Sequence, residues 1–390
     1  MSAQYDALIV GGGPAGATCA WLLRNAGMQV AIIDKQQFPR DKICAGWITP
    51  AVVETLQIDL QDYARGRVLQ PLTGFITAMI GEKIRLTQYG KPMSYGIRRC
   101  EFDHYLLQRS GAAMHLGEPV KSLAYENGLW LVNQKYQAPL LIGAGGHFCP
   151  VVRLTGARQT NSEPIVAAQE VEFEMTPEHK AHCLVDPQAP ELYFCRDLKG
   201  YGWVFRKGDY LNIGLGRQDN HRLSAHVNEF VDYLQQAGRI PPALPKKMSG
   251  HAYLLYGDTP RKIVDDGLLI IGDAAGLAYA QSGEGIRPAI ESAVLAAQTI
   301  LQHARTGSDY SRQALSEYET LLSRRFGDRH KRTNIKIAAL VPQGIKRSLA
   351  ARLLASKYFS RNFVLNKWFF HLQQPPLDSG FGTHGIPHGA

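Results

Sequence analysis

The first 35 residues constrain the fold more strongly than any other stretch of the chain. An apolar run, 7–10, leads into the glycine-rich turn 11–16, and a helix-like stretch, 17–25, follows it. A second apolar run, 30–33, ends at Asp34. Strand, glycine turn, helix, strand and terminal acid form the order of a parallel βαβ unit that binds a dinucleotide.

Each special position in this unit has a predicted role. Gly11 allows a tight turn, Gly13 lets the backbone approach a pyrophosphate, and Gly16 lets the helix pack close to the sheet. The free N–H groups of the helix N-terminus face the phosphates, and Asp34 is placed to accept hydrogen bonds from a ribose. The residues expected to contact the cofactor here are Gly11, Gly13, Pro14, Ala15, Gly16, Asp34 and Lys35.

The composition is that of an ordinary globular protein. The chain has 390 residues, of which 45% are hydrophobic and 20% charged, and no apolar run reaches the length of about 18 residues that spans a membrane. The N-terminus lacks a secretion signal, so we expect a cytoplasmic protein. Six cysteines without a C-x-x-C pair and thirteen histidines without a H-E-x-x-H pattern predict no metal.

The rest of the chain predicts a second sheet inserted into the first domain. Short β-branched and aromatic segments within 164–216 are typical of an antiparallel sheet, and 72–86 predicts a hairpin. A buried-strand pattern, 267–271, ends in glycine, and the long helix 288–305 follows it. Residues 50–63 predict one further helix.

We therefore predict an α/β fold with a discontinuous Rossmann-like nucleotide-binding domain, an antiparallel-sheet substrate domain and a helical C-terminal segment. The predicted bounds are 1–70, 96–155 and 255–305 for the first domain, 71–95 and 156–254 for the second, and 306–390 for the C-terminal segment, which ends in a flexible tail.

Five separated motifs occur together in a specific order. They are the turn 11–16, the loop 38–46, Arg99-x-x-Phe102-Asp103, Gly272-Asp273-Ala274-Ala275-Gly276 and Ser282-Gly283-Glu284-Gly285-Ile286. As a set they resemble the FAD-dependent geranylgeranyl reductase group, within the p-hydroxybenzoate hydroxylase-like flavoprotein superfamily. The aromatic stretch 201–205 also resembles the substrate-domain motif of these reductases, and the whole resemblance covers roughly residues 5–300.

The resemblance implies an FAD-dependent oxidoreductase that reduces carbon–carbon double bonds of an apolar, prenyl-like substrate by hydride transfer from flavin N5. NAD(P)H or an electron-carrier protein would reduce the FAD. Asp273 follows a strand and suits the ribityl hydroxyls, while the turn 283–285 places a helix N-terminus at the flavin pyrimidine edge. Further residues implied to bind the cofactor are Lys42, Cys44, Arg99 (or Arg98), Val120, Gly272, Asp273, Gly283, Gly285 and Ile286.

Three residues are candidates for catalysis. Cys44 aligns with a cysteine near the flavin in many of these reductases, where it could donate a proton, or it is a packing residue. Tyr201 and Trp203 alternate with Phe205, so on a strand all three share one face. They form either an aromatic wall over the flavin or part of the sheet core.

Two departures from the pattern leave alternatives open. Arg206 stands where the reductase motif usually has a proline, and Gly145-Gly146 where flavin hydroxylases have Asp-Gly. The chain also lacks a second G-x-G-x-x-G within a βαβ unit, so we expect no dedicated NAD(P)H domain. The alternatives are a flavin monooxygenase or halogenase of an aromatic substrate, and a non-catalytic flavin- or lipid-binding protein at a membrane.

The positive charge is concentrated near the C-terminus. Residues 321–370 hold twelve Lys and Arg but one acid, Asp328, which more than accounts for the net charge of +9. The segment is a solvated helical face, or it binds an anionic membrane surface and makes the protein peripheral on the inner face of the membrane. No recognition motif accompanies the charge, so we expect no nucleic-acid partner. The resemblance implies a small apolar or aromatic substrate as the main partner.

Overall fold

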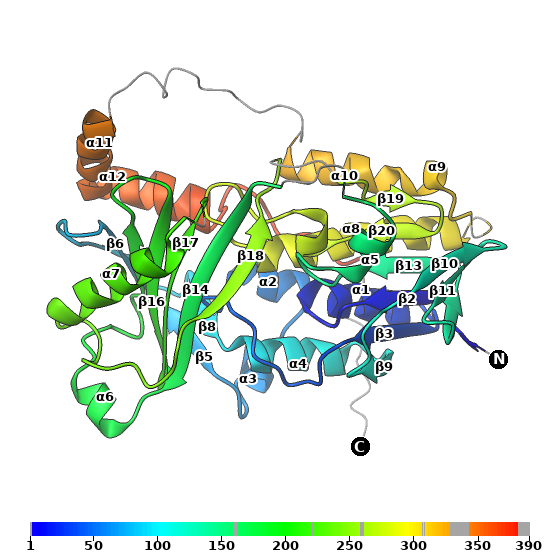
Figure 1. Ribbon diagram of the computed structural model, residues 1–390, viewed down its shortest axis with the longest axis horizontal. Helices are drawn as coiled ribbons and strands as arrows, with labels where there is room; N and C mark the ends of the chain where they lie inside the picture. Colours follow the sequence, from blue (N-terminus) through cyan, green and yellow to red (C-terminus); the bar gives the residue numbers. More distant parts are fainter. Residues whose placement is uncertain are drawn as a thin grey trace.

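The computed structural model describes residues 2–158, 163–219, 221–257, 261–305, 307, 309–327 and 343–380, with the backbone alone at 343–347. Two large sheets dominate this part of the chain and lie side by side in Figure 1. In this view the six-stranded sheet lies on the right with α1 (Pro14–Asn25) and α8 (Ile286–Arg305). The seven-stranded sheet lies on the left with α7 (Leu223–Gln236). This is the predicted α/β class with two distinct sheets.

The six-stranded sheet gathers strands from distant parts of the sequence, in the order β19-β20-β13-β2-β3-β9. Its strands are β2 (Ala7–Val10), β3 (Val30–Asp34), β9 (Ala113–Leu116), β13 (Leu140–Gly143), β19 (Val264–Asp265) and β20 (Leu268–Ile270). All neighbours pair in parallel except β19 with β20. β2, β3, β13 and β20 read as near-continuous apolar runs because they are almost entirely buried, as the central strands of a parallel sheet are.

The glycine turn between β2 and α1 (Pro14–Asn25) is held by a very close backbone approach. Gly11 has a φ of +115°, and a Cβ on Gly16 would lie 1.9 Å from the Gly11 carbonyl oxygen. No side chain larger than hydrogen fits at Gly16, so the predicted packing role of this glycine is met. α1 packs against α8 (Ile286–Arg305) and α4 (Arg99–Arg109).

The seven-stranded sheet has the order β18-β14-β17-β16-β15-β6-β7. Its strands are β6 (Gly74–Met79), β7 (Arg85–Gln88), β14 (Ile165–Glu174), β15 (Glu191–Phe194), β16 (Gly200–Lys207), β17 (Tyr210–Arg217) and β18 (Ser249–Leu254). All pairs are antiparallel except β15 with β6. The predicted antiparallel sheet and the β6–β7 hairpin are present, and β18 is an additional strand that the sequence reading did not include.

Two small sheets contain the other strands of the described residues. β4 (Trp47–Ile48), β8 (Ser94–Ile97) and β5 (Leu69–Leu72) form one, and β1 (Ala3–Gln4), β12 (Tyr136–Ala138), β11 (Leu129–Val132) and β10 (Leu123–Glu126) form the other. The first of these sheets connects the two halves of the molecule: β5 leads into β6 of the seven-stranded sheet, and β8 leads from β7 back to α4.

The single helix predicted over 50–63 is wrong. The structure has two short helices there, α2 (Pro50–Thr55) and α3 (Leu60–Tyr63). Gln57 between them has a φ of +52°, which ends a helix, and the Asp59 side chain accepts hydrogen bonds from the backbone N–H groups of Gln61 and Asp62 as an N-cap. The remaining helices before residue 280 are α5 (Pro150–Leu154), α6 (Pro177–Ala181), α7 (Leu223–Gln236) and the 3₁₀ turn η1 (Gly272–Ala275).

The C-terminal segment divides between the two halves of the molecule. α9 (Arg312–Leu315) and α10 (Glu317–Phe326) pack against α8, whereas α11 (Gln343–Ala355), α12 (Lys357–Phe359) and the π-helix η3 (Ser360–Phe369) lie along the seven-stranded sheet (Figure 1). The predicted helix break near Pro342 and most of the predicted flexible tail fall outside the described residues. None of the helices in the described ranges has the length and hydropathy needed to cross a membrane.

Replacing Gly16 tests the close approach that shapes the first unit. Gly16→Ala puts a methyl group into the Gly11 carbonyl, so we expect the free energy of unfolding to fall by about 3 kcal/mol or more in urea titrations. Gly250→Ala is the matched control, because its Cβ would meet nothing closer than 4.0 Å, and it should change stability by less than about 1 kcal/mol. Equal effects of both substitutions would contradict this account.

Candidate active site at the junction of two cavities

A cavity of about 560 Å³, with several charged residues in its lining, lies at the carboxyl ends of β2 and β3 and reaches the seven-stranded sheet. We call it the cofactor cavity. Most of the predicted cofactor and catalytic residues line it: Gly11, Gly13, Pro14, Ala15, Asp34, Lys35, Lys42, Cys44, Arg99, Tyr201, Trp203, Asp273, Gly283, Gly285 and Ile286. Residues that are more than 250 positions apart in the sequence therefore meet in one place.

Three predicted cofactor residues do not line this cavity. Gly16 packs under the turn, and Gly272, with a φ of +62°, would bring a Cβ to 3.0 Å from the Ala15 Cβ. Val120 is 7% exposed and belongs to the hydrophobic core of the six-stranded sheet. Gly16 and Gly272 thus shape the backbone around the cavity, whereas Val120 packs in the hydrophobic core.

Two helix N-termini and two carboxylates face the cofactor cavity. α1 begins after Gly13 without a side-chain cap, so backbone N–H groups are available there. α8 begins directly after Gly285; its Arg287 N–H donates to the Glu284 side chain at 2.8 Å, whereas Gly285 and Ile286 line the cavity. Asp34 accepts hydrogen bonds from the backbone N–H groups of Gly12 at 2.7 Å and Gln36 at 2.9 Å. Asp273 lies beside Gly285, where a Cβ would be 3.0 Å from its Oδ1. This combination of N–H groups and acids suits a ligand that carries both phosphates and hydroxyls.

Arg99, rather than Arg98, faces the cofactor cavity. Its guanidinium donates to both carboxylate oxygens of Asp103, at 2.8 and 2.9 Å. Burial favours the neutral form, but the Asp103 carboxylate holds the pKa of Arg99 above its ordinary value. Arg40, which sequence reasoning missed, pairs with the same carboxylate at 3.2 Å and lines the cavity too. Arg98 instead binds Glu101 and Glu172 outside the cavity.

Lys42 pairs with His251 on the wall of the cofactor cavity, with 2.7 Å between Lys42 Nζ and His251 Nε2. Burial lowers the pKa of Lys42 to about 8, and burial together with the charge of Lys42 lowers the pKa of His251 to about 3. The imidazole is therefore neutral at physiological pH and accepts a hydrogen bond from the ammonium. Lys42 thus presents a positive charge to a ligand in this cavity.

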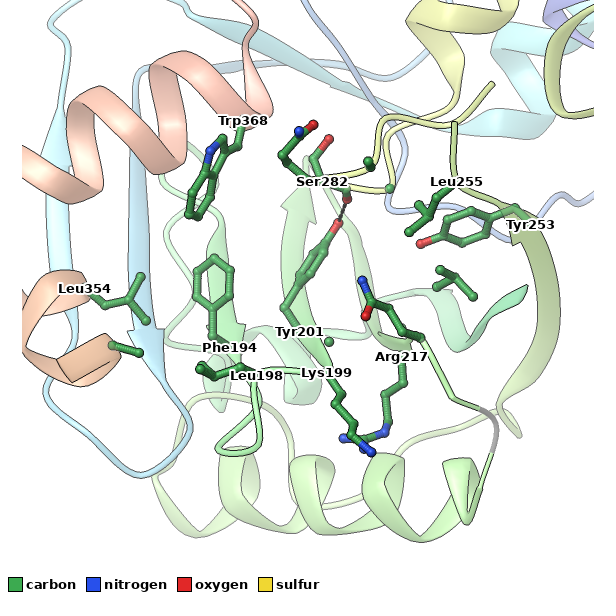
Figure 2. Close-up of a pocket in the computed structure, with 18 of the residues that line it drawn as sticks. Phe194, Leu198, Lys199, Tyr201, Arg217, Tyr253, Leu255, Ser282, Leu354 and Trp368 are labelled. Atoms are coloured by element: carbon green, nitrogen blue, oxygen red, sulfur yellow. Dashed lines mark hydrogen bonds between the residues drawn. The ribbon is translucent and has the colours of Figure 1, made fainter. Parts of the chain in front are cut away.

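A second, mostly apolar cavity of about 350 Å³ adjoins the first, and we call it the apolar cavity (Figure 2). Tyr201, Tyr253 and Gly283 line both cavities. Figure 2 shows Tyr201 pointing to Ser282, whose backbone oxygen accepts its hydroxyl hydrogen, while Trp368 and Leu354 close the opposite wall from the C-terminal helices. Gly283 must be glycine, because a Cβ there would lie 2.4 Å from the Tyr253 hydroxyl.

The three predicted catalytic residues occupy different positions. Tyr201 lines both cavities, whereas Cys44 and Trp203 line the cofactor cavity alone. Phe205 shares the sheet face with Tyr201 and Trp203, as predicted, but packs against Trp47 away from both cavities. Burial raises the pKa of Tyr201 well above its ordinary value, so its hydroxyl keeps its proton and remains a hydrogen-bond donor.

Sequence reasoning missed several lining residues. Tyr253 and His251 come from β18, which was not predicted, although the run His251-Ala252-Tyr253-Leu254 alternates as a strand does. Leu354 and Trp368 belong to the C-terminal helices, and a helical periodicity alone says nothing about which cavity a helix will cover. The signal for Tyr253 was thus present in the sequence, whereas that for Leu354 and Trp368 was not.

Glu170 on β14 supports the loop that carries Cys44. The side chain is 5% exposed, Oε1 accepts from the Cys44 backbone N–H at 2.5 Å, and Oε2 has no hydrogen-bond partner among the described residues. Burial raises the pKa of Glu170 to about 7 against the opposing effects of the Cys44 N–H, Lys207 and Lys42, and Glu172 adds to the rise. The carboxyl group therefore titrates near neutral pH.

Comparison with known proteins defines the class of this fold and site. Residues 9–47 match the NAD(P)-binding Rossmann-like domain family. A digeranylgeranylglycerophospholipid reductase of Methanocaldococcus jannaschii is 26% identical over 339 residues, which cover 84% of this chain and 83% of that protein. An uncharacterised protein of Methanosarcina barkeri is 27% identical over 326 residues, covering 80% of this chain and 78% of its own length.

Solved structures share the same fold. A geranylgeranyl bacteriochlorophyll reductase-like protein of Thermoplasma acidophilum superposes with a TM-score of 0.77 and 22% identity, over 95% of this chain and 97% of its own. A halogenase in complex with phloroglucinol and FAD has a TM-score of 0.63 and 16% identity, over 94% and 85% of the two chains. The class that the fold and the relatives define is that of the FAD-dependent oxidoreductases. Within this class the chain is similar to the geranylgeranyl reductases, as its motifs predicted.

The raised pKa of Glu170 predicts a specific pH dependence of stability. The folded state holds the proton up to about pH 7, whereas the unfolded carboxyl loses it near 4.5, so this group destabilises the fold progressively as pH rises between these values. Glu170→Gln removes that penalty. We compare the free energies of unfolding of the variant and the wild type by urea unfolding at pH 5.5 and at pH 8. The difference between them should be about 2 kcal/mol more in favour of the variant at pH 8 than at pH 5.5. A difference that does not change with pH would contradict the assignment.

Proposed function

We propose that the protein binds FAD in the cofactor cavity and an apolar, prenyl-like chain in the apolar cavity, and that it reduces carbon–carbon double bonds of that chain. The observation that carries this proposal is the shared wall of Tyr201, Tyr253 and Gly283, which joins a cavity of phosphate- and hydroxyl-binding character to an apolar one. The names of the similar reductases support the same substrate class.

The residues of the cofactor cavity fit FAD. Gly11, Gly13 and the N-terminus of α1 would hold the pyrophosphate, Asp34 the adenosine ribose and Asp273 the ribityl chain. A Cβ on Gly13 would meet nothing closer than the Arg40 guanidinium at 3.5 Å, so the protein itself has room for a side chain there. That the position is nonetheless glycine indicates that a ligand fills the space.

The domain assignment follows from this placement. We assign FAD to the segments 1–70, 96–155 and 255–305, and the substrate to 71–95 and 156–254. The C-terminal segment adds to the substrate side, because Leu354, Phe359 and Trp368 line the apolar cavity.

When bound, FAD would supply the hydride through N5, with NAD(P)H or an electron-carrier protein as the source of electrons. The chain's own residues set the conditions for this chemistry. The N-terminus of α8 favours negative charge at the turn 283–285, and the mostly apolar lining of the second cavity favours an apolar ligand over water. Cys44, beside Arg99, is the group positioned to supply the proton that completes the addition of two hydrogens across the double bond.

Gly13→Ala separates FAD binding from folding. The methyl group enters the space assigned to the pyrophosphate, so we expect FAD affinity to fall by at least about tenfold while the stability of the FAD-free protein changes by no more than about 1 kcal/mol. Flavin fluorescence titration and urea unfolding measure the two quantities. Wild-type affinity in this variant would contradict the placement of the pyrophosphate.

Product analysis tests the reaction. The purified protein with FAD, dithionite and a geranylgeranyl lipid under nitrogen should yield products two hydrogens heavier for each reduced double bond, resolved by mass spectrometry. The monooxygenase alternative predicts instead an oxygenated aromatic product that forms only in air with NAD(P)H. The non-catalytic alternative predicts bound FAD and no product under either condition.

We further propose that α11, α12 and η3 bind an anionic membrane surface, which would deliver a lipid substrate. Leu349 is 56% exposed and Tyr358 71% exposed on these helices, with Arg352, Lys357 and Arg361 among them. The same helices present Leu354 and Trp368 to the apolar cavity. Exposed apolar groups interspersed with cations are typical of segments that lie in a lipid headgroup layer.

A pair of matched variants tests this membrane surface. Leu349→Ser with Tyr358→Ser should lower binding to phosphatidylglycerol vesicles by about tenfold or more in co-sedimentation assays, because two exposed apolar groups are lost. Leu184→Ser with Tyr125→Ser changes the same residue types elsewhere on the surface, where they are 63% and 43% exposed, and should leave binding unchanged. Equal loss in both, or equal binding to neutral and anionic vesicles, would contradict the proposal.

A further inference from the structure

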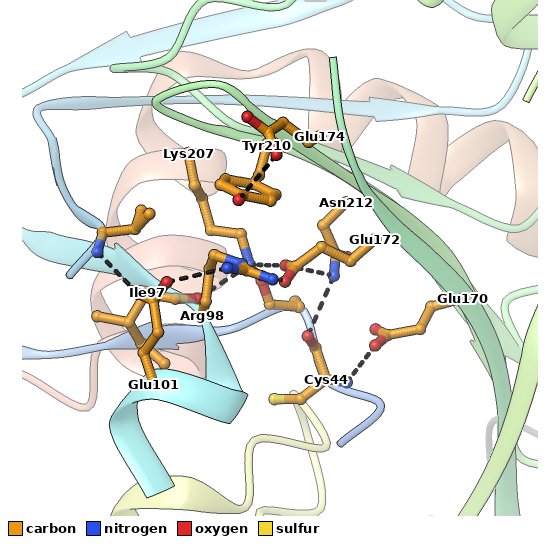
Figure 3. A network of polar contacts seen from close by, with 12 residues as sticks. Cys44, Ile97, Arg98, Glu101, Glu170, Glu172, Glu174, Lys207, Tyr210 and Asn212 are labelled. Atoms are coloured by element: carbon orange, nitrogen blue, oxygen red, sulfur yellow. Dashed lines mark hydrogen bonds and ion pairs between the residues drawn. The ribbon is translucent and has the colours of Figure 1, made fainter. Parts of the chain in front are cut away.

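The loop that carries Cys44 is bound by side chains from three neighbouring strands of the seven-stranded sheet (Figure 3). The Cys44 backbone N–H donates to Glu170 of β14, and the Cys44 carbonyl accepts from Asn212 Nδ2 of β17 at 3.3 Å. The next carbonyl, that of Ala45, accepts from Lys207 Nζ of β16 at 3.0 Å. Consecutive backbone groups of one loop are thus satisfied by the sheet rather than by water.

The register of the sheet brings these side chains to one face. Glu170 pairs with Gly214 and Glu172 with Asn212 between β14 and β17, while Lys207 pairs with Tyr210 between β16 and β17. Residues two apart on a strand point to the same side, so the charged and amide groups all face the loop. Trp203 lies on this face as well, and its indole N–H donates to Asn212 Oδ1 at 2.8 Å. Asn212 therefore connects a wall residue of the cofactor cavity to the loop.

Lys207 is the central group of this arrangement. Its side chain is fully buried, and its ammonium group makes three contacts: the Ala45 carbonyl, the Ile97 carbonyl at 2.9 Å and the Glu172 carboxylate. All three of its hydrogens have partners. Space for the lysine comes from Gly46 and Gly96, since a Cβ on either would lie within 3 Å of its side chain. Gly46 also has a φ of +69°, and a Cβ there would lie 2.3 Å from the Ile97 carbonyl oxygen, so the backbone and Lys207 both require glycine at this position.

Such a buried ion pair is costly to build and adds little stability compared with apolar packing. Phe205 and Trp203 show that the same sheet face accommodates apolar side chains. A role in stability alone thus does not account for a charge on this face, whereas the contacts to the Cys44 loop do.

We propose that Lys207, Asn212 and Glu170 are positioning residues that fix the Cys44 backbone, and so the direction of its thiol, relative to the cofactor cavity. The inference rests on the proposed function for its catalytic meaning, since Cys44 is there the group that supplies a proton. That the sheet holds the loop follows from the hydrogen bonds described above, and the accessibility of Cys44 measures it without turnover.

The test measures the rate at which iodoacetamide alkylates Cys44 in the full chain, with and without FAD, by peptide mass spectrometry. Lys207→Met with Glu172→Gln removes the ammonium without leaving a buried unpaired carboxylate, and Cys44 should react about tenfold faster, as expected for the loss of a charged hydrogen bond that restrains the loop. Asn212→Leu, which keeps the Lys207–Glu172 pair, should give about a threefold increase.

Glu101→Gln is the matched control. It breaks the ion pair with Arg98 at the outer side of the same network but touches no group of the loop, so Cys44 should react as in the wild type. Cys19 and Cys149, both buried in the core of the six-stranded sheet, report on general unfolding within each sample. Local release of the loop raises the reactivity of Cys44 alone, whereas global destabilisation raises that of all three.

The proposal is overturned if the Cys44 rate stays within about twofold of wild type in both variants, or if the rates of Cys19 and Cys149 rise in parallel with it. If the Lys207 variant does not fold, the Cys44 alkylation rate of Asn212→Leu alone tests the proposal. Where lipid reduction occurs, the same variants should lower kcat with little change in KM. If the wild type shows no turnover, the proposed function is wrong. The alkylation rates still test whether Lys207 and Asn212 hold the Cys44 loop.

Discussion

The two-cavity arrangement depends on the contact between β16 and the turn that precedes α8. The Tyr201 hydroxyl donates to the Ser282 carbonyl, and Gly283 lies so close to Tyr253 that only hydrogen fits between them. This contact joins the seven-stranded sheet to the helix whose N-terminus faces the cofactor cavity. If the turn moved away from Tyr201, the cofactor and apolar cavities would no longer share a wall, and a ligand in one could not touch a ligand in the other.

A second set of contacts supports the same junction from the opposite side. The loop 42–47 crosses from the six-stranded sheet to the seven-stranded one, and buried polar side chains of the latter hold its backbone. Lys42 pairs with His251, and Arg99 with Asp103, so charged groups around the cofactor cavity are also fixed before any ligand binds. Preorganised charges and dipoles of this kind lower the cost of orienting a cofactor.

The sequence predicted the parts of this site that depend on local chemistry. The turn 11–16, Asp34, Asp273 and the turn 283–285 need glycine or a carboxylate at fixed offsets from a strand or helix, and all of them reach one cavity. The parts that depend on packing between distant elements were not predictable. Lys207, Asn212 and Glu170 become meaningful only through the strand register, and Leu354 and Trp368 only through the path of the C-terminal helices. The helix expected over 50–63 failed for a local reason, the positive φ of Gln57.

The central claim is that an apolar chain in one cavity meets a flavin in the other, and anaerobic flavin reoxidation tests it most directly. The FAD-loaded protein is reduced with dithionite, freed of excess reductant and mixed with a geranylgeranyl lipid while flavin absorbance is followed. The account predicts that the oxidised flavin spectrum returns as the lipid double bonds are consumed, and that a saturated chain of equal length has no effect. Flavin that stays reduced under nitrogen in the presence of the lipid would contradict it.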